Sequence, residues 1–240
     1  MKRIRKKTLC IVIVCVLVAA LVAGAVVYFA VILPQRREQE RVMQMLEQYS
    51  SEKVEVYQQE NETLDDYEVE VAFVGDSLTE GYDLNKYYPQ YITANRGISG
   101  DTSFGLEKRL QVSVYDLRPR VVVMLIGANN VDTMMDNYES ILKGLKENLP
   151  DSDVVLLSLT AMGGEYWGRN NQFAVANNVE IERLAQEYGF SYVDLYTPLY
   201  DESIGEVYAG YTTDGGHLTD KGYEVITAQI TPVLKKLLGK

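Results

Sequence analysis

The sequence predicts an α/β domain built on a mainly parallel sheet of five strands, preceded by one apolar N-terminal helix. Two observations lead to this expectation. Over roughly the last 180 residues, short apolar segments alternate with segments whose apolar residues recur at helical spacing. Near the N terminus, 25 consecutive residues carry no charge. Apolar strands separated by helices are typical of a parallel sheet with right-handed crossovers, because such strands are buried on both faces.

The uncharged segment is long enough to cross a membrane. It covers residues 9–33, and at about 1.5 Å per residue a helix of this length spans a hydrocarbon core of about 30 Å with some tilt. A cleaved signal peptide is the competing interpretation, but the apolar region of a signal peptide normally has only about 7–15 residues. We therefore expect an uncleaved, single-pass membrane anchor.

The charges around this segment predict its orientation. Five basic residues precede it, whereas the arginines that follow lie among glutamates. The basic residues in front are Lys2, Arg3, Arg5, Lys6 and Lys7. This asymmetry favours a cytoplasmic N terminus over residues 1–8 and an extracytoplasmic location for the rest. Residues 42–240 hold 15 basic and 32 acidic residues, a formal charge of −17, which disfavours nucleic acid as a partner.

Cysteine positions and polarity predict the remaining organisation. Cys10 and Cys15 both lie in the uncharged segment, so the exported part has no disulfide and no thiolate metal site. Residues 34–66 are polar, with apolar residues at helical spacing as far as about residue 61, and we interpret them as a helical stalk and linker. The globular domain is expected to cover residues 67–240.

Within this domain, five segments are predicted to be strands and three to be long helices. The strands are expected at residues 67–74, 91–95, 121–126, 154–157 and 192–195. The helices are expected over residues 138–149, residues 173–188 and from about residue 219, with Pro150 and Gly189 ending the first two and Pro232 kinking or dividing the third. The residues of the second helix expected to face the core are Phe173, Ala176, Val179, Leu184 and Tyr188.

Glycines and short polar residues follow the first three predicted strands. These segments are Gly75-Asp76-Ser77-Leu78-Thr79, residues 95–102 (Asn-Arg-Gly-Ile-Ser-Gly-Asp-Thr) and Gly127-Ala128-Asn129-Asn130. Taken singly, each is also compatible with a simple turn. Because the carboxyl ends of parallel strands meet at one edge of a sheet, we expect the Ser77 hydroxyl, a glycine-flanked backbone amide and the Asn129 amide to lie together. Such an arrangement is a nucleophile beside an oxyanion hole.

The only histidine of the chain is the candidate base. His217 lies three residues after Asp214, with two glycines between them and a helix after them. This spacing allows a carboxylate to hold one ring nitrogen while the other faces a hydroxyl group. One histidine and no exported cysteine leave only oxygen ligands for a metal, so neither a metal site nor a cofactor is expected.

Four sequence blocks resemble those of the GDSL or SGNH hydrolases, a family of serine esterases and acylhydrolases. The blocks are Gly75-Asp76-Ser77-Leu78-Thr79, residues 95–101, Gly127-Ala128-Asn129 and Asp214-Gly215-Gly216-His217, in the family's order. The resemblance covers about residues 67–240 and implies a three-layer α/β/α, flavodoxin-like fold. It implies Ser77 as nucleophile, His217 as base and Asp214 as its orienting carboxylate, with the Ser77 and Gly100 backbone N–H groups and the Asn129 side chain as oxyanion hole.

One position departs from the family's pattern. The third block usually reads Gly-x-Asn-Asp, and Asn130 stands here in place of the aspartate. Because Asn129 is the residue that matches the oxyanion-hole position, the change concerns the support of the loop or the level of activity.

Three functions agree with these observations. A membrane-anchored, extracytoplasmic serine esterase acting on short O-acyl groups, acetyl in particular, of carbohydrates or cell-envelope polymers is favoured by the polar segments expected around Ser77. A lysophospholipase or thioesterase would need an apolar groove for an acyl chain. A non-catalytic binding module would tolerate loss of Ser77, His217 or Asp214, and all three are present.

Overall fold

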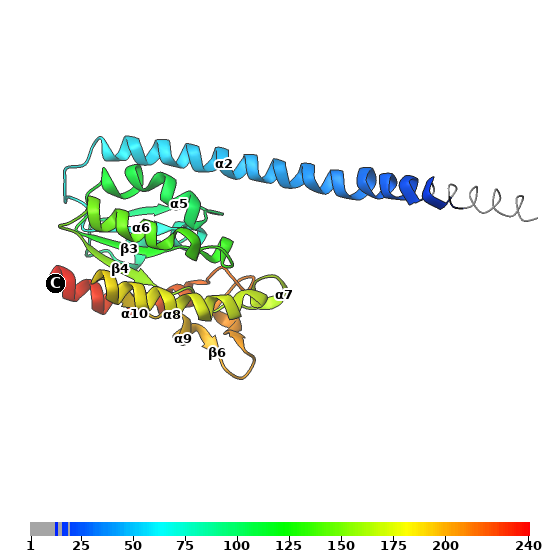
Figure 1. Cartoon of the computed structure of the whole chain (residues 1–240). Helices are drawn as coiled ribbons and strands as arrows, with labels where there is room; N and C mark the ends of the chain where they lie inside the picture. The colour runs from blue at the N-terminus through cyan, green and yellow to red at the C-terminus, as the bar shows by residue number, and fades with distance from the viewer. Residues whose placement is uncertain (1–12, 14–15, 19) are drawn as a thin grey trace, which may run out of the picture. The chain divides into compact units, whose positions relative to one another are not determined.

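The structure is a computed structural model that describes residue 13, residues 16–18 and residues 20–240 (Figure 1). The chain divides into two compact units, Met1–Tyr49 and Ser50–Lys240, which are considered separately. The five basic residues at positions 2–7, both cysteines and the start of the predicted anchor lie outside the described residues.

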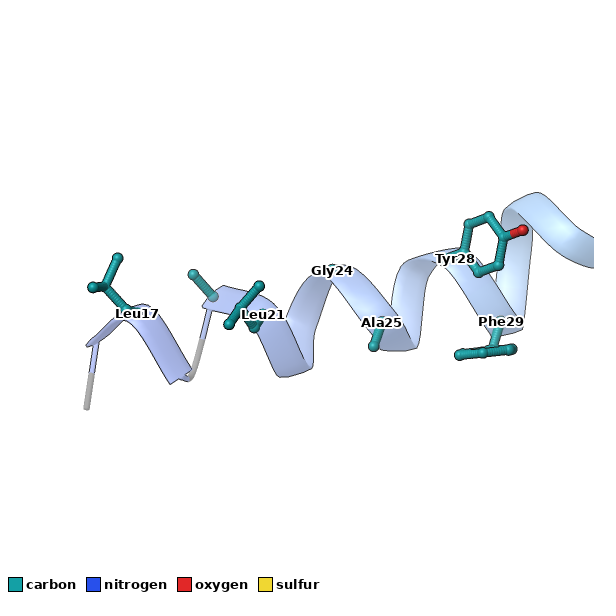
Figure 2. A pocket seen from close by; sticks show the side chains of 7 residues that line it. Leu17, Leu21, Gly24, Ala25, Tyr28 and Phe29 are labelled. Atoms are coloured by element: carbon teal, nitrogen blue, oxygen red, sulfur yellow. The ribbon is translucent and has the colours of Figure 1, made fainter. Parts of the chain in front are cut away.

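The described part of the first unit is helical, and its N-terminal part is apolar. A helix runs from Val16 to Asn61, with a π-helical stretch at Tyr28–Ile32 followed by α2 (Leu33–Asn61). Figure 2 shows Leu17, Leu21 and Phe29 projecting from this helix, and they are exposed. The hollow along them is lined only by residues of this one helix. By length and composition the helix can cross a membrane, and a signal sequence would meet the same criteria.

The second unit contains the sheet and the remaining helices. Its strands are β1 (Val71–Gly75), β2 (Thr93–Gly97), β3 (Val121–Leu125), β4 (Asp153–Leu157), β5 (Ser191–Val193), β6 (Tyr200–Asp201) and β7 (Glu206–Val207). Its α-helices are the end of α2, α3 (Ser77–Glu80), α4 (Leu84–Tyr87), α5 (Ser103–Leu110), α6 (Met135–Asn148), α7 (Gly164–Trp167), α8 (Asn171–Tyr188), α9 (Tyr196–Leu199) and α10 (Asp220–Leu238). A π-helical stretch covers Gln111–Tyr115, and 3-10 turns cover Ala128–Asn130, Gly168–Asn170 and Ala209–Tyr211.

The first five strands form one parallel sheet in the order β2-β1-β3-β4-β5, which confirms the predicted fold. In the ladder, Gly75 at the end of β1 lies opposite Gly97 of β2 and Leu125 of β3. The three polar segments that follow these strands therefore start from the same edge of the sheet. β6 and β7 form a separate antiparallel hairpin.

Both faces of the sheet are buried, which explains the unbroken apolar sequence of β3. Val121, Val123 and Leu125 pack in one core with the inner face of α10. Val122 and Met124 pack in a second core with α5, α6 and α8. Because successive side chains of a strand point to opposite faces, a strand covered on both sides has no polar positions.

Some predicted details differ from the structure. Residues 67–70 are not part of β1, and Tyr67 has a positive φ of 63°. In α8, Phe173 and Val179 are exposed, whereas Ile181 and Ala185 are buried. The predicted inner face was therefore wrong at Phe173, Ala176 and Val179, because apolar residues lie on several sides of the helix, but it was right at Leu184, which is buried, and at Tyr188, which packs against the core. Pro232 lies inside α10, which continues through it to Leu238.

The domain boundary expected between residues 66 and 67 remains a prediction. The second compact unit begins upstream of it, at Ser50, so the last turns of α2 belong to the same unit as the sheet.

Candidate active site

Ser77 is held where β1 gives way to α3. Gly75 ends the strand, and a Cβ atom there would lie 1.9 Å from the carbonyl oxygen of Leu125, so only glycine fits. Asp76 is the N-cap of α3, and its Oδ1 accepts a hydrogen bond of 3.0 Å from the Leu78 amide. Ser77 is then the first residue of the helix. The same turn therefore caps α3 through Asp76 and positions Ser77 at the start of that helix.

The carboxyl group of Asp76 is buried directly beside the serine. Asp76 is only 1% exposed. Burial raises the pKa of Asp76 to about 6, and the charge of Asp101 adds to this, while the hydrogen bond from the Leu78 amide acts in the opposite direction. The turn that carries Ser77 therefore bears a carboxyl group that gains and loses a proton just below neutral pH.

Ser77, His217 and Asp214 form a hydrogen-bonded chain. Ser77 Oγ lies 3.0 Å from His217 Nε2, and His217 Nδ1 lies 2.8 Å from Asp214 Oδ2. Burial alone would raise the pKa of Asp214, but hydrogen bonds from the His217 amide, the His217 ring and the Gly216 amide together lower this pKa well below its usual range. Asp214 therefore stays ionised and holds the Nδ1–H tautomer of His217, which leaves Nε2 free to accept the serine proton.

The loop that carries His217 is fixed by its own backbone. The Thr213 amide donates to the His217 carbonyl oxygen at 2.9 Å, and the Gly215 amide donates to Thr212 Oγ1 at 2.7 Å. Asp214 Oδ1 also accepts hydrogen bonds from the Gly216 and His217 amides. The short spacing between Asp214 and His217 thus lets one carboxylate orient both the loop and the imidazole ring.

The two glycines between these residues allow a second segment to pack against the loop. Gly215 has a φ of 95°, and a Cβ atom on it would lie 1.9 Å from the Gly163 carbonyl oxygen. A Cβ atom on Gly216 would lie 2.5 Å from the ring of Trp167. The Trp167 ring meets the His217 ring edge to face, with 5.8 Å between the centroids. Trp167 therefore forms one wall beside the base.

The predicted oxyanion-hole residues lie in adjoining loops. Asn129 Nδ2 donates a hydrogen bond of 2.9 Å to the carbonyl oxygen of Asp101, the residue after Gly100. Gly100 has a φ of 78°, a conformation that favours glycine. Gly97 has a different role: a Cβ atom there would lie 2.2 Å from the Glu80 amide nitrogen, so this glycine permits close packing of β2 on α3.

Asn130, the residue that departs from the family's pattern, connects the loop after β3 to the start of α5. Its Oδ1 accepts a hydrogen bond from the Ser103 amide at 3.2 Å, and its Nδ2 donates to Ser103 Oγ at 3.0 Å. Ser103 Oγ in turn donates to Asn137 Oδ1 at 2.6 Å. An amide can accept from the backbone and donate to the hydroxyl, so the loop keeps two connections with asparagine at this position.

Arg109 is the main residue at this site that sequence analysis missed. It is 5% exposed, and its Nε donates to Asp101 Oδ2 at 2.7 Å. The same guanidinium donates to the carbonyl oxygens of Arg96 and Gly75, both at 2.9 Å. It therefore joins the ends of β1 and β2. The only sequence signal was its position between Leu106 and Leu110 on the inner face of a short helix.

A surface cleft of about 440 Å³ adjoins the site. Its lining combines polar and apolar side chains: Asn129, Asp132 and Arg169 are polar or charged, Tyr166, Trp167 and Phe173 are aromatic, and Ala128 and Val131 are aliphatic. Tyr166 is 64% exposed, and the Arg169 guanidinium lies 5.3 Å from its ring centroid. Among the described residues, no group of three or more His, Cys, Asp or Glu side chains is arranged to hold a metal ion. Trp167 lines this cleft and contacts the His217 ring, so the cleft adjoins the Ser77–His217 pair.

Comparisons with solved structures give the same fold. A Streptococcus pneumoniae protein provisionally described as a platelet activating factor matches with a TM-score of 0.74 and 23% identity, over 83% of this chain and 99% of that one. This share exceeds the length of residues 67–240, so at least about 25 matched residues precede Tyr67 and the match includes part of α2.

Two further matches are also bacterial. A GDSL-like lipase from Bacteroides thetaiotaomicron is 28% identical, with a TM-score of 0.68, over 76% of this chain and 97% of that one. An acetylxylan esterase from Geobacillus stearothermophilus is 18% identical, with a TM-score of 0.57, over 70% and 95% of the two chains. No curated protein matches the sequence.

Residues 73–225, more than half of the chain, match the family model described as GDSL-like lipase/acylhydrolase. This range includes all four sequence blocks and the Ser77, His217 and Asp214 side chains. The chain belongs to the GDSL-like lipase/acylhydrolase family of ester-hydrolysing serine hydrolases.

Proposed function

We propose that this protein is a membrane-anchored, extracytoplasmic serine esterase that removes short acyl groups, acetyl in particular, from hydroxyl groups of carbohydrates or cell-envelope polymers. The observation that carries the catalytic part is the hydrogen-bonded chain from Ser77 Oγ through His217 to Asp214, with distances of 3.0 and 2.8 Å. Family membership supplies the ester-hydrolysing reaction.

In the proposed acylation, Ser77 Oγ attacks the ester carbonyl carbon while its proton moves to His217 Nε2. The carbonyl oxygen becomes an oxyanion, which the Ser77 and Gly100 backbone N–H groups and Asn129 Nδ2 stabilise. Asp214 stays ionised and stabilises the imidazolium. As the intermediate collapses, the bond to the alcohol breaks and Nε2 returns the proton to the alcohol oxygen.

Deacylation repeats these steps with water. His217 Nε2 takes a proton from a water molecule as its oxygen attacks the acyl-enzyme, and a second oxyanion forms in the same hole. Collapse of this intermediate releases the carboxylic acid and returns the proton to Ser77 Oγ. The His217 side chain is 45% exposed, so water has access to the base.

The polar cleft supports the choice of a sugar as the alcohol. Aromatic rings offer apolar faces to a sugar, and polar side chains of the same cleft can bind its hydroxyl groups. Trp167 links the cleft to the base, because it lines the cleft and contacts the His217 ring. In this proposal the alcohol part of an ester bound at Ser77 extends into the cleft.

The anchored, outward-facing arrangement rests on the apolar helix and on the basic residues in front of it. Protease added to intact cells should cut the polar segment around residues 35–49 and release an active fragment. Full protection of this segment until the cells are opened would contradict the proposed orientation, and a mature chain that begins after the apolar segment would identify a signal peptide.

The catalytic residues should differ in importance. His217→Ala removes the base, so we expect kcat to fall by about 10⁴-fold or more, whereas Asp214→Asn leaves a poorly oriented imidazole and should be roughly 10- to 100-fold less damaging. Initial rates with a short acyl ester measure both effects. Asp151→Asn, an exposed substitution in the turn after α6, is the matched control. Near-normal turnover by folded His217→Ala protein would require another base.

Acyl length should separate the esterase from a lipase-like enzyme. Each added methylene stabilises the transition state by about 0.8 kcal/mol only where apolar walls receive it. Charged and polar side chains, those of Asp132, Arg169 and Gln172, interrupt the apolar lining of the cleft, so we expect a higher kcat/KM for acetyl than for octanoyl esters of one alcohol. A steady rise from acetyl to octanoyl would favour a lysophospholipase or thioesterase instead.

A substitution in the cleft tests the proposed sugar preference. Tyr166→Ala removes an exposed ring that does not belong to the Ser77–His217–Asp214 chain. Loss of its stacking should raise KM for an acetylated oligosaccharide by about three- to tenfold and leave a small aryl acetate unaffected. Equal effects on both substrates would argue against a sugar in this cleft.

A further inference from the structure

We propose that the last turns of α2, residues 50–61, are a built-in support for the active site, in which Lys53 and Glu80 are positioning residues for the oxyanion loop. The oxyanion loop is defined here as residues 98–102. The inference rests on the proposed function, in which the Gly100 N–H group stabilises the oxyanion.

Side chains from the end of α2 are part of the packing of β2. Tyr57 is 3% exposed, and its hydroxyl donates a hydrogen bond of 2.6 Å to the Gly97 carbonyl oxygen at the end of that strand. Burial raises the pKa of Tyr57 to about 12, so its hydroxyl remains a proton donor. Asn61 Nδ2 donates to the Val112 carbonyl oxygen at 2.7 Å. The end of α2 is thus fastened at both of these points.

Arg96 of β2 depends on the same helix. It is 2% exposed, its guanidinium lies 4.6 Å from the Tyr57 ring centroid, and its terminal nitrogens donate to Glu60 Oε2 at 2.5 Å and Asn61 Oδ1 at 3.1 Å. A buried cation without its acidic partner is strongly unfavourable. The sequence of β2 therefore requires that α2 stay in contact with it.

Lys53 connects this support to the oxyanion loop through Glu80. Lys53 Nζ lies 2.8 Å from Glu80 Oε1, with the two side chains 30% and 18% exposed. Glu80 Oε2 accepts hydrogen bonds from the Ser99 amide at 2.7 Å and from Ser99 Oγ at 2.5 Å. Glu80 is also the last residue of α3, the helix that begins with Ser77. One carboxylate thus joins the nucleophile's helix to the residue before Gly100.

The far side of the oxyanion loop has separate attachments. Arg109 binds the Asp101 carboxylate, and Asn129 binds the Asp101 carbonyl oxygen. Loss of Lys53 would therefore loosen the Ser99 side of the loop and leave the Asp101 side in place. The expected consequence is a Gly100 amide that is less well positioned for the oxyanion, with little change in how the ester binds in its ground state.

The match to the pneumococcal structure, which includes part of α2, agrees with a helix that belongs to the fold. The same helix is continuous in the chain with the apolar segment. The predicted membrane anchor and the proposed support, residues 50–61, are therefore successive segments of one helix.

The test uses the full-length protein in detergent micelles. Removal of a whole oxyanion donor costs about 100- to 1,000-fold in kcat, so the indirect change Lys53→Met should lower kcat by about three- to tenfold and leave KM within about twofold. Lys53→Arg should restore most of the rate. Lys143→Met removes an exposed lysine of α6 and is the matched control. In a double-mutant cycle, Lys53→Met should have no further effect on Glu80→Gln protein.

Amide hydrogen exchange provides a readout independent of turnover. Exchange over residues 98–102 should be faster in Lys53→Met than in wild type or Lys143→Met, while the sheet keeps its protection. Unchanged kcat and exchange in Lys53→Met, or additive effects with Glu80→Gln, would overturn the proposal. Faster exchange throughout the domain would also overturn it, because it would indicate general destabilisation. A wild-type protein that hydrolyses no ester would refute the proposed function, while exchange would still test the support.

Discussion

The buried guanidinium of Arg109 holds the catalytic edge of the sheet together. It donates to the carbonyl oxygen of Gly75 at the end of β1 and to that of Arg96 in β2, and it pairs with the Asp101 carboxylate at 2.7 Å. Breaking a buried ion pair of this kind by removing one partner typically costs about 3–5 kcal/mol. Because Ser77 lies two residues after Gly75 and residues 98–102 follow β2, Arg109 helps to fix the position of Ser77 relative to this loop.

His217 comes from near the C-terminal end of the sequence and reaches Ser77 at the same edge through a separately fixed loop. Asp214 orients both the backbone and the ring of His217, and the glycines at 215 and 216 leave room for the 163–168 segment with Trp167. Trp167, which lines the cleft, is consequently in direct contact with the His217 ring. The His217 side chain in this loop is 45% exposed and is therefore open to solvent.

The features that could be predicted from the sequence are those determined by residues close together in the chain. Apolar runs such as β3, the glycine turn after β1 and the short Asp214–His217 spacing each have a local physical signature, and the structure has the expected sheet. Contacts between distant residues have no such signature. Sequence analysis did not single out Arg109, and it placed Lys53 only within the predicted helical stalk, because Gly75 and Glu80, which they contact, lie 34 and 27 residues away in the sequence. In α8, Val179 was misplaced because periodicity alone does not identify which apolar side faces the core.

The most direct test of this account is the reaction of the full-length protein with an organophosphonate probe, followed by intact-mass measurement and peptide mapping. A serine hydroxyl that passes its proton to a paired histidine beside an oxyanion hole is nucleophilic, whereas an ordinary surface serine is not. The account predicts one adduct, located on Ser77, that is absent from Ser77→Ala protein and forms more slowly in His217→Ala protein. An adduct on another serine, or no adduct on protein that still hydrolyses an ester, would contradict it.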